Sequence, residues 1–129
     1  RAEEITADRV ASWCDYHRQL SPLAREGIIE CPVVPEGCSH NGHMYYVKTK
    51  DEEERSRLMA MLQEHGVMSA FHYVPLHRSP MGQKLSRFHG EDRYTTLESG
   101  RLLRLPLYYQ LSPEHISEVV NLVTLFYEK

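Results

Sequence analysis

The sequence predicts an α+β domain, a small sheet of about three strands with helices packed on it. Two observations lead to this prediction. Short segments rich in β-branched and aromatic residues alternate with longer segments whose apolar residues recur at helical spacing. The chain has 129 residues, which suits one domain with a modest hydrophobic core.

The chain opens on an amphipathic helix. Its apolar stripe recurs at i, i+3, i+4 and i+7, and Leu20 extends it. This pattern places Cys14 in the core rather than in a reactive position. Since the chain starts at Arg1 and is helical from its first residues, we expect the domain to have been cut from a longer protein. The stripe consists of Val10, Trp13, Cys14, His17 and Leu20.

A loop-rich segment and a first clear strand follow the helix. Prolines and glycines interrupt Ser21–Asn41, within which Gly27–Val34 has the composition of a short strand. The segment His43–Lys50 alternates in the manner of a strand. Its inward face would carry Tyr45, Val47 and Thr49.

A second helix is predicted over Glu52–His65. Asp51 is a suitable N-cap with Glu54 three residues later, and Gly66 suits the position after the helix end. The three glutamates of the first turn also favour the positive end of the helix dipole. Its inward stripe would be Leu58, Met61, Leu62 and His65.

The segment after this helix, VMSAFHYVPLHRSP, predicts a strand over Val67–Val74 that ends in polar rings. The rings are those of His72, Tyr73 and His77, on a turn stiffened by Pro75. Polar rings at a strand end are typical of ligand-presenting sites, but a half-buried edge strand explains them equally well. The pattern alone leaves both interpretations open.

The remainder of the chain completes the α+β pattern. A polar stretch over Leu76–Asp92 precedes a short helix predicted at Arg93–Gly100. Leu102–Tyr109 predicts a third strand, whose Pro106 indicates an edge position. In the last helix Ser112 is the cap and Pro113 the first residue. Its apolar face would consist of Ile116, Val119, Val120, Val123, Phe126 and Tyr127.

Composition and charge argue against several classes of protein. The formal charge is −3 without a basic cluster, so the footprint of a nucleic-acid-binding protein is missing. No apolar run approaches the roughly 18 residues of a membrane span. Three cysteines fit a reducing compartment better than a disulfide framework, and we expect a cytoplasmic protein.

The sequence contains no self-contained catalytic constellation. Cys31, Cys38, His40 and His43 lie within 13 residues, but their spacing matches neither a zinc finger nor a zinc ribbon. We therefore expect no metal site and interpret them as loop cysteines and surface histidines. Phosphate-loop, dinucleotide-binding and G-x-S-x-G motifs are also missing.

Four tracts nevertheless carry a resemblance to a known family. They are HMYYVKTKDEEERSRL, GVMSAFHYVPLHRSPMG, FHGEDRYTTLESGRLLRLPLYYQLSPEH and the closing helix Val119–Tyr127. In this order they resemble the C-terminal domain of the pyridoxal-phosphate (PLP)-dependent nucleotide-sugar aminotransferases of the DegT/StrS type. The resemblance implies the small domain of the type I, aspartate aminotransferase-like fold over residues 21–129, with residues 1–20 similar to the interdomain helix.

The third tract resembles the subgroup that aminates dTDP-4-oxo-6-deoxy-D-glucose to dTDP-4-amino-4,6-dideoxygalactose for enterobacterial common antigen. In that family a large N-terminal domain, absent here, holds PLP and supplies the Schiff-base lysine. The resemblance thus implies a cytoplasmic homodimer that uses L-glutamate as amino donor. It also implies that the 129-residue chain alone is inactive, holds no cofactor and has no catalytic residue of its own.

The resemblance gives this domain the role of one wall of the sugar-nucleotide pocket. The matching pocket-facing positions are His43, His72, Tyr73 and His77, which would hydrogen-bond substrate oxygens and not abstract protons. Packing inside the fold is the alternative for each of them. The Leu76–Asp92 segment would either close over substrate or serve as a solvated connector.

Two further classes remain open on sequence grounds. The chain could be a free-standing small-molecule-binding regulatory module, or a packing and dimerisation element without a ligand. If a large domain is missing, apolar surface should be exposed where that domain packs.

Overall fold

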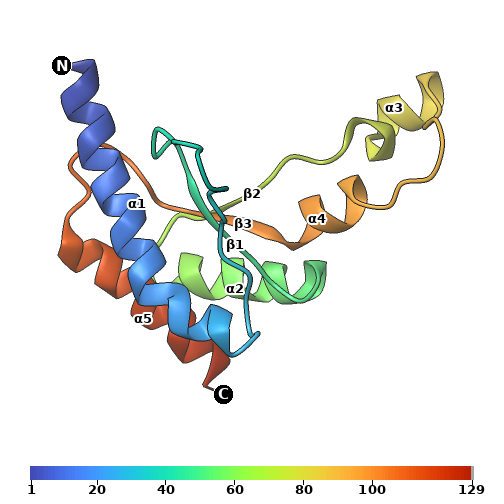
Figure 1. The fold of residues 1–129 in the computed structure, drawn as a ribbon. Helices are drawn as coiled ribbons and strands as arrows, with labels where there is room; N and C mark the ends of the chain where they lie inside the picture. The colour runs from blue at the N-terminus through green and yellow to red at the C-terminus, as the bar shows by residue number, and fades with distance from the viewer. Residues whose placement is uncertain (129) are drawn as a thin grey trace.

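The computed structural model describes residues 1–128, which form an α+β domain with a three-stranded sheet (Figure 1). The α+β fold class predicted from the sequence is confirmed. The elements in chain order are α1 (Ala2–Arg25), β1 (Tyr45–Lys48), α2 (Glu52–Glu64), β2 (Ala70–Phe71), the 3₁₀ turn η1 (Leu76–Arg78), α3 (Pro80–Leu85), α4 (Thr95–Arg101), β3 (Leu102–Leu105) and α5 (Pro113–Tyr127).

The sheet is antiparallel, with strand order β1-β3-β2. Tyr45 lies opposite Leu105 and Val47 opposite Leu103, so these four side chains share one face. The prediction that Pro106 places the third strand at an edge is wrong, because β3 is central and ends at Leu105. The missing N–H of Pro106 therefore falls just outside the hydrogen-bonded ladder, where it disrupts nothing.

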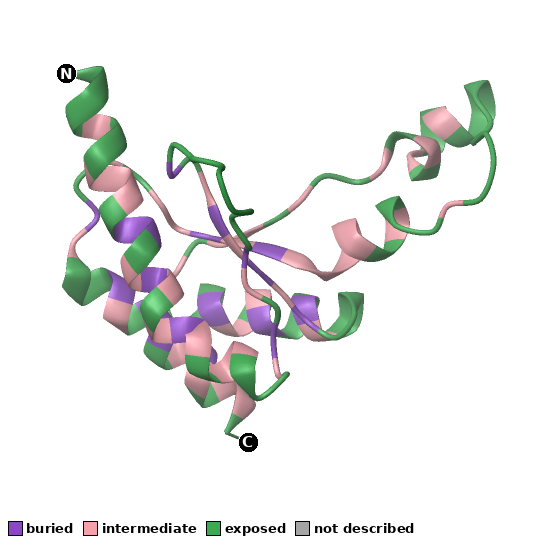
Figure 2. Cartoon of the chain, in the orientation of Figure 1, coloured by how far each residue is buried: buried purple, intermediate pink, exposed green. Residues whose placement is uncertain are grey.

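One hydrophobic core lies between this sheet face and the three long helices, and Figure 2 shows its buried residues on α1, α2, α5 and the strands. The predicted inward face of β1 is confirmed, since Tyr45, Val47 and Thr49 are buried. On α5 the predicted stripe is also confirmed: four of its residues are buried, and Phe126 and Tyr127 pack partly against the core. The four are Ile116, Val119, Val120 and Val123.

The first helix differs from its prediction in length and in register. It continues past Pro22 to Arg25, because Leu23 and Ala24 pack against the core and offset the roughly 3 kcal/mol that an interior proline costs. Its buried residues are Ser12, Trp13, Tyr16 and Leu20. Cys14 is exposed, so its assignment to the core is wrong. Tyr16, not Cys14, occupies the turn between Trp13 and Leu20 on the inward face.

Helix α2 has the predicted caps. The Glu54 amide donates to Asp51 Oδ1 at 2.9 Å, and Gly66 adopts a φ of 77°, which favours glycine after a helix end. Leu58 and Leu62 are fully buried. His65 is exposed at the helix end, so its predicted place on the inward stripe is wrong.

Three of the predicted strands are clearly shorter in the structure. The Val67–Val74 strand reduces to Ala70–Phe71, because the chain pairs with β3 there and then leaves the sheet toward Pro75. The Gly27–Val34 strand reduces to one bridge between Glu30 and Lys48. The third strand ends at Leu105 rather than Tyr109.

The segment after β2 forms an arm, residues 75–94, that contains η1 and α3 and projects away from α1 and α5 (Figure 1). Predicted only as a polar stretch, it carries strongly exposed apolar side chains, among them Leu76 at 82% and Leu85 at 78%. Met68 and Val33 are similarly exposed elsewhere. Several large apolar side chains are thus exposed, and the idea that a large domain packs on them stays a prediction. No helix among residues 1–128 is long and apolar enough to cross a membrane.

Candidate functional site

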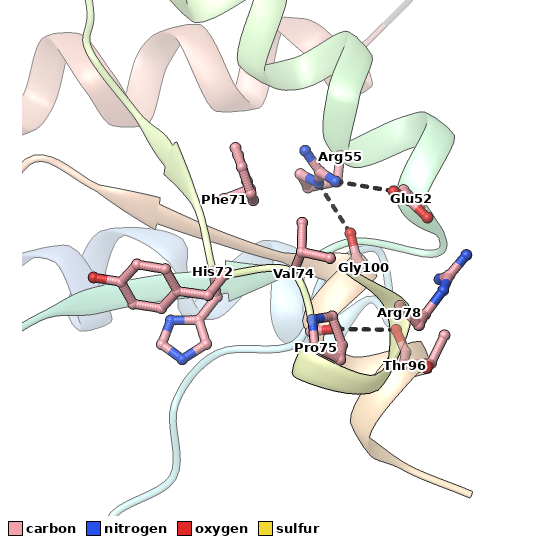
Figure 3. Close-up of a pocket in the computed structure, with 11 residues that line it drawn as sticks. Glu52, Arg55, Phe71, His72, Val74, Pro75, Arg78, Thr96 and Gly100 are labelled. Carbon is pink, nitrogen blue, oxygen red and sulfur yellow. Dashed lines mark hydrogen bonds and ion pairs between the residues drawn. The ribbon is translucent and has the colours of Figure 1, made fainter. Parts of the chain in front are cut away.

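A cavity of about 290 Å³ lies where the chain leaves β2, between the start of α2 and helix α4. Figure 3 shows its lining, with Arg55 and Glu52 from α2, the residues after Phe71, and Gly100 and Thr96 from α4. His72 and Tyr73, two of the predicted site residues, also line it. The structure therefore places a cavity at the strand end that the sequence singled out.

Arg55 is a buried and firmly held polar side chain of the cavity. It is buried, and its Nε donates to the carbonyl oxygen of Gly100 at 2.9 Å. Its guanidinium carbon lies 5.2 Å from the centre of the Phe71 ring, a cation–π distance. The nearest carboxylate oxygen of Glu52 is 3.5 Å from Nη2. Arg55 thus joins α2, β2 and the end of α4.

His72 and Tyr73 lie next to each other, with ring centres 5.4 Å apart. The Tyr73 side chain is 72% exposed, and the Arg104 guanidinium lies 5.5 Å from its ring centre. His72 is half-buried, and its Nδ1 is a buried atom without a hydrogen-bond partner among residues 1–128. An unsatisfied buried ring nitrogen is uncommon in a folded protein and suits a position that meets a ligand.

His77 has a different environment and does not line the cavity. Its Nε2 lies 2.8 Å from Asp92 Oδ2 and 3.2 Å from the Thr96 hydroxyl, and its ring contacts Phe88 at 4.5 Å. Hydrogen bonds from Thr96 and from His77 hold the pKa of Asp92 below its ordinary value. These contacts tie η1 to the start of α4, so His77 holds the arm in place.

His43 lies in a third place, beside helix α1. Arg9 donates through Nη2 to the backbone oxygen of His43 at 2.7 Å, and the same nitrogen is 3.2 Å from its Nδ1. Gly42 packs so closely on α1 that a Cβ there would lie 2.7 Å from the Arg9 backbone. Among the described contacts, none joins His43 to His72, Tyr73 or His77. The structure brings together only two of the four predicted residues.

The four residues considered for metal binding lie in separate environments. His40 packs on Trp13 with ring centres 4.4 Å apart, His43 contacts Arg9, and Cys38 is exposed. Burial raises the pKa of the Cys31 thiol. Within residues 1–128, no group of three or more His, Cys, Asp or Glu side chains is placed to hold a metal ion.

Lys48 belongs to an ion-pair cluster outside the cavity. Its Nζ lies 2.7 Å from Glu30 and 2.8 Å from Glu98, and these partners raise the pKa of the ammonium group. Arg101 pairs with the same two glutamates. This cluster joins the loop after α1 to β1 and α4 and holds Lys48 in its charged form.

Arg55 and Arg78 are the positively charged cavity residues that the sequence did not predict. A signal for Arg55 was present, because it precedes Leu58 and Leu62 at i, i+3 and i+7 on the buried stripe of α2. An arginine on a buried stripe needs an ion-pair or hydrogen-bond partner inside the protein. Arg78 had no comparable signal, because only the fold brings the arm beside α2.

The chain's relationship to known proteins is consistent with this architecture. The model of the DegT/DnrJ/EryC1/StrS aminotransferase family matches residues 1–124. The chain belongs to this family. The match includes α1 and every strand of the sheet, together with all the residues that line the cavity.

Solved structures share the fold. The aminotransferase TlmJ from Streptoalloteichus hindustanus superposes with a TM-score of 0.84 at 24% identity, covering 99% of this chain and 33% of that one. DesV from S. venezuelae, solved with a ketimine intermediate, gives a TM-score of 0.79 at 24% identity over 98% of this chain and 33% of DesV. NtdA from Bacillus subtilis, solved with bound cofactor PMP, gives 0.74 at 21% identity, with 97% and 29% coverage. The chain spans about one third of the length of these proteins.

Proposed function

We propose that this chain is the C-terminal small domain of a sugar-nucleotide aminotransferase. The whole protein would transfer an amino group from L-glutamate to the 4-keto carbon of dTDP-4-oxo-6-deoxy-D-glucose. The observation that carries the proposal is the family match over residues 1–124 by a chain about one third as long as its structural neighbours. The choice of sugar rests on the tract FHGEDRYTTLESGRLLRLPLYYQLSP, which includes α4 and β3.

The cavity beside β2 supports a role in substrate binding. His72 and Tyr73 line it with polar atoms that the fold leaves available, and Tyr73 is largely exposed. In this proposal they form part of the wall that meets the sugar nucleotide. His77 would contribute by fixing the arm, and His43 would reach substrate only through a surface beside α1.

The cofactor of such an enzyme would be PLP, and NtdA is a family-like structure solved with its amine form. This chain's own described lysines do not fit the role of a Schiff-base lysine. That role needs a neutral amine in a pocket, whereas Lys48 is held charged by two glutamates and Lys50 and Lys84 are exposed. The group that holds the cofactor would therefore lie on a large N-terminal domain, which is the first partner of this chain.

The remaining parts of the proposal follow from the same family membership. The whole protein would work as a cytoplasmic homodimer, and the 129-residue chain alone would not transaminate. The exposed apolar residues of the arm, together with Met68, support a surface on which another domain or subunit packs.

The test is spectroscopic and uses the full-length protein. Purified protein should show the visible absorbance of bound PLP, and addition of L-glutamate should bleach it. The keto sugar should then restore the colour. A colourless protein that does not respond to glutamate would refute the proposal and leave a regulatory or packing role for this domain.

A further inference from the structure

We propose that the cavity lined by Arg55 and Arg78 is a binding site for an anionic group, either a phosphate or a carboxylate. This inference deepens the proposed function, on which it rests for the identity of the natural ligand. The site itself is argued from four features of the cavity: its charge, its free donors, its size and the burial of Arg55.

The charge of the cavity is positive. Two arginines and one carboxylate, that of Glu52, line it. The Glu52 side chain is 62% exposed and approaches Arg55 only at 3.5 Å, the outer limit of a hydrogen bond. A carboxylate so placed compensates the buried guanidinium weakly. Arg104 adds a further positive charge next to Tyr73.

The free hydrogen-bond donors of the cavity belong to the arginines. Arg55 uses Nε on Gly100, but among residues 1–128 its Nη1 has no hydrogen-bond partner. The Arg78 guanidinium forms no ion pair within the described part of the chain. The Arg78 backbone oxygen accepts a hydrogen bond from Gln83 Nε2 at 3.0 Å. The hydroxyls of Thr96 and Ser99 already donate to Asp92 and to the Thr96 backbone oxygen. Two guanidinium groups with unused N–H donors are suited to the oxygens of an anion.

Burial distinguishes Arg55 from an ordinary surface arginine, whereas Arg78 lies at the exposed side of the cavity. Arg55 is 7% exposed, and a buried charge with an imperfect partner is destabilising unless something compensates it. Its Nε bond and the Phe71 ring fix the plane of the guanidinium before any ligand arrives. The cavity of about 290 Å³ is at the low end for a ligand pocket, so it suits one anionic group rather than an entire sugar nucleotide.

In the proposed enzyme two substrates carry such groups. The sugar nucleotide has a diphosphate, and L-glutamate has two carboxylates. Both present oxygens with the geometry that a guanidinium binds, so the chemistry of the site is shared and the experiment must distinguish the two sources.

The first experiment uses the 129-residue chain with pyrophosphate, inorganic phosphate and glutarate as separate probes at low ionic strength. Two-dimensional NMR follows the backbone amides and the Arg55 Nε–H signal. We expect saturable chemical-shift changes at Arg55, at Arg78 and at the backbone amides next to Val74 and Pro75. Arg78 is exposed, so Arg78→Gln should leave the fold intact and weaken binding of the preferred probe about tenfold. Arg87→Gln, an exposed arginine of the same arm outside the cavity, is the matched control and should leave affinity unchanged.

The result that overturns the site is the absence of saturable binding for all three probes, or binding that Arg78→Gln and Arg87→Gln weaken equally. Stronger binding of pyrophosphate assigns the site to the diphosphate, and stronger binding of glutarate assigns it to the amino donor. In the full-length protein, Arg78→Gln should accordingly raise KM for only one of the two substrates. Failure of this site is distinguishable from failure of the proposed function, because glutamate bleaching of the full-length protein does not require the probes to bind.

Discussion

The hydrogen bond between Tyr16 and Pro106 makes the first helix part of the same folding unit as the sheet. The Tyr16 hydroxyl donates to the Pro106 carbonyl at 3.0 Å, and the Tyr16 side chain is fully buried. Tyr16→Phe removes this bond and leaves the ring, so it creates no cavity. The carbonyl loses its partner in a half-buried position, which should cost about 1 kcal/mol.

The expected loss is measurable by urea unfolding followed by far-ultraviolet circular dichroism. For a domain of this size it corresponds to a fall in Tm of about 4 °C, with an unchanged m-value. Tyr94→Phe is the control, because Tyr94 is 73% exposed and its hydroxyl has no described partner. If Tyr16→Phe is as stable as the control variant, the bond does not fix α1 to the sheet and the reasoning is refuted.

Two further predictions concern pH and the arm. Burial raises the pKa of three tyrosines above the ordinary value of about 10, so the folded state keeps their protons at a pH where the unfolded state loses them. The contribution of these tyrosines to stability should therefore be complete below about pH 10 and fall as pH rises above it. Phenolate absorbance and circular dichroism, recorded together, should show their ionisation coupled to unfolding. Exposed tyrosines such as Tyr73 and Tyr94 ionise without unfolding, so the reasoning is refuted only if all eight tyrosines form phenolate while the circular dichroism stays unchanged. His77→Ala should make residues 86–94 more mobile, so that their amide hydrogens exchange about tenfold faster. His89→Ala, at an exposed position, should leave these exchange rates unchanged. Equal exchange in both variants would show that His77 does not hold the arm. The three tyrosines are Tyr16, Tyr45 and Tyr127.

Local sequence patterns predicted the elements that depend on local chemistry. The cap at Asp51, the glycine after α2 and the apolar face of α5 are recognisable because each needs only neighbouring residues. What failed depended on contacts between distant segments. The helix continues through Pro22 because the residues after it reach the core. The third strand is central because it pairs with both β1 and β2, and Pro106 is compatible with this because the strand ends one residue before it.

For the candidate site, too, the sequence predicted what is local and missed what depends on contacts between distant segments. The sequence located the strand end and named His72 and Tyr73, which do line a cavity. It could not assign Arg78, because the arm's position beside α2 depends on the path of the whole segment after β2. For His77 the sequence could not show that Asp92, fifteen residues later, would be its partner.

The most direct test of the central claim separates the two half-reactions that the proposed function assigns to the full-length protein. If Tyr73 belongs to the sugar-side wall, Tyr73→Ala should leave bleaching by glutamate unchanged and slow the return of colour with the keto sugar about tenfold, the effect of losing one aromatic contact. Tyr94→Ala, equally exposed but outside the cavity, should affect neither step. Return of colour at the unaltered rate, or equal slowing of both half-reactions, would contradict the assignment of Tyr73 to the sugar-side wall.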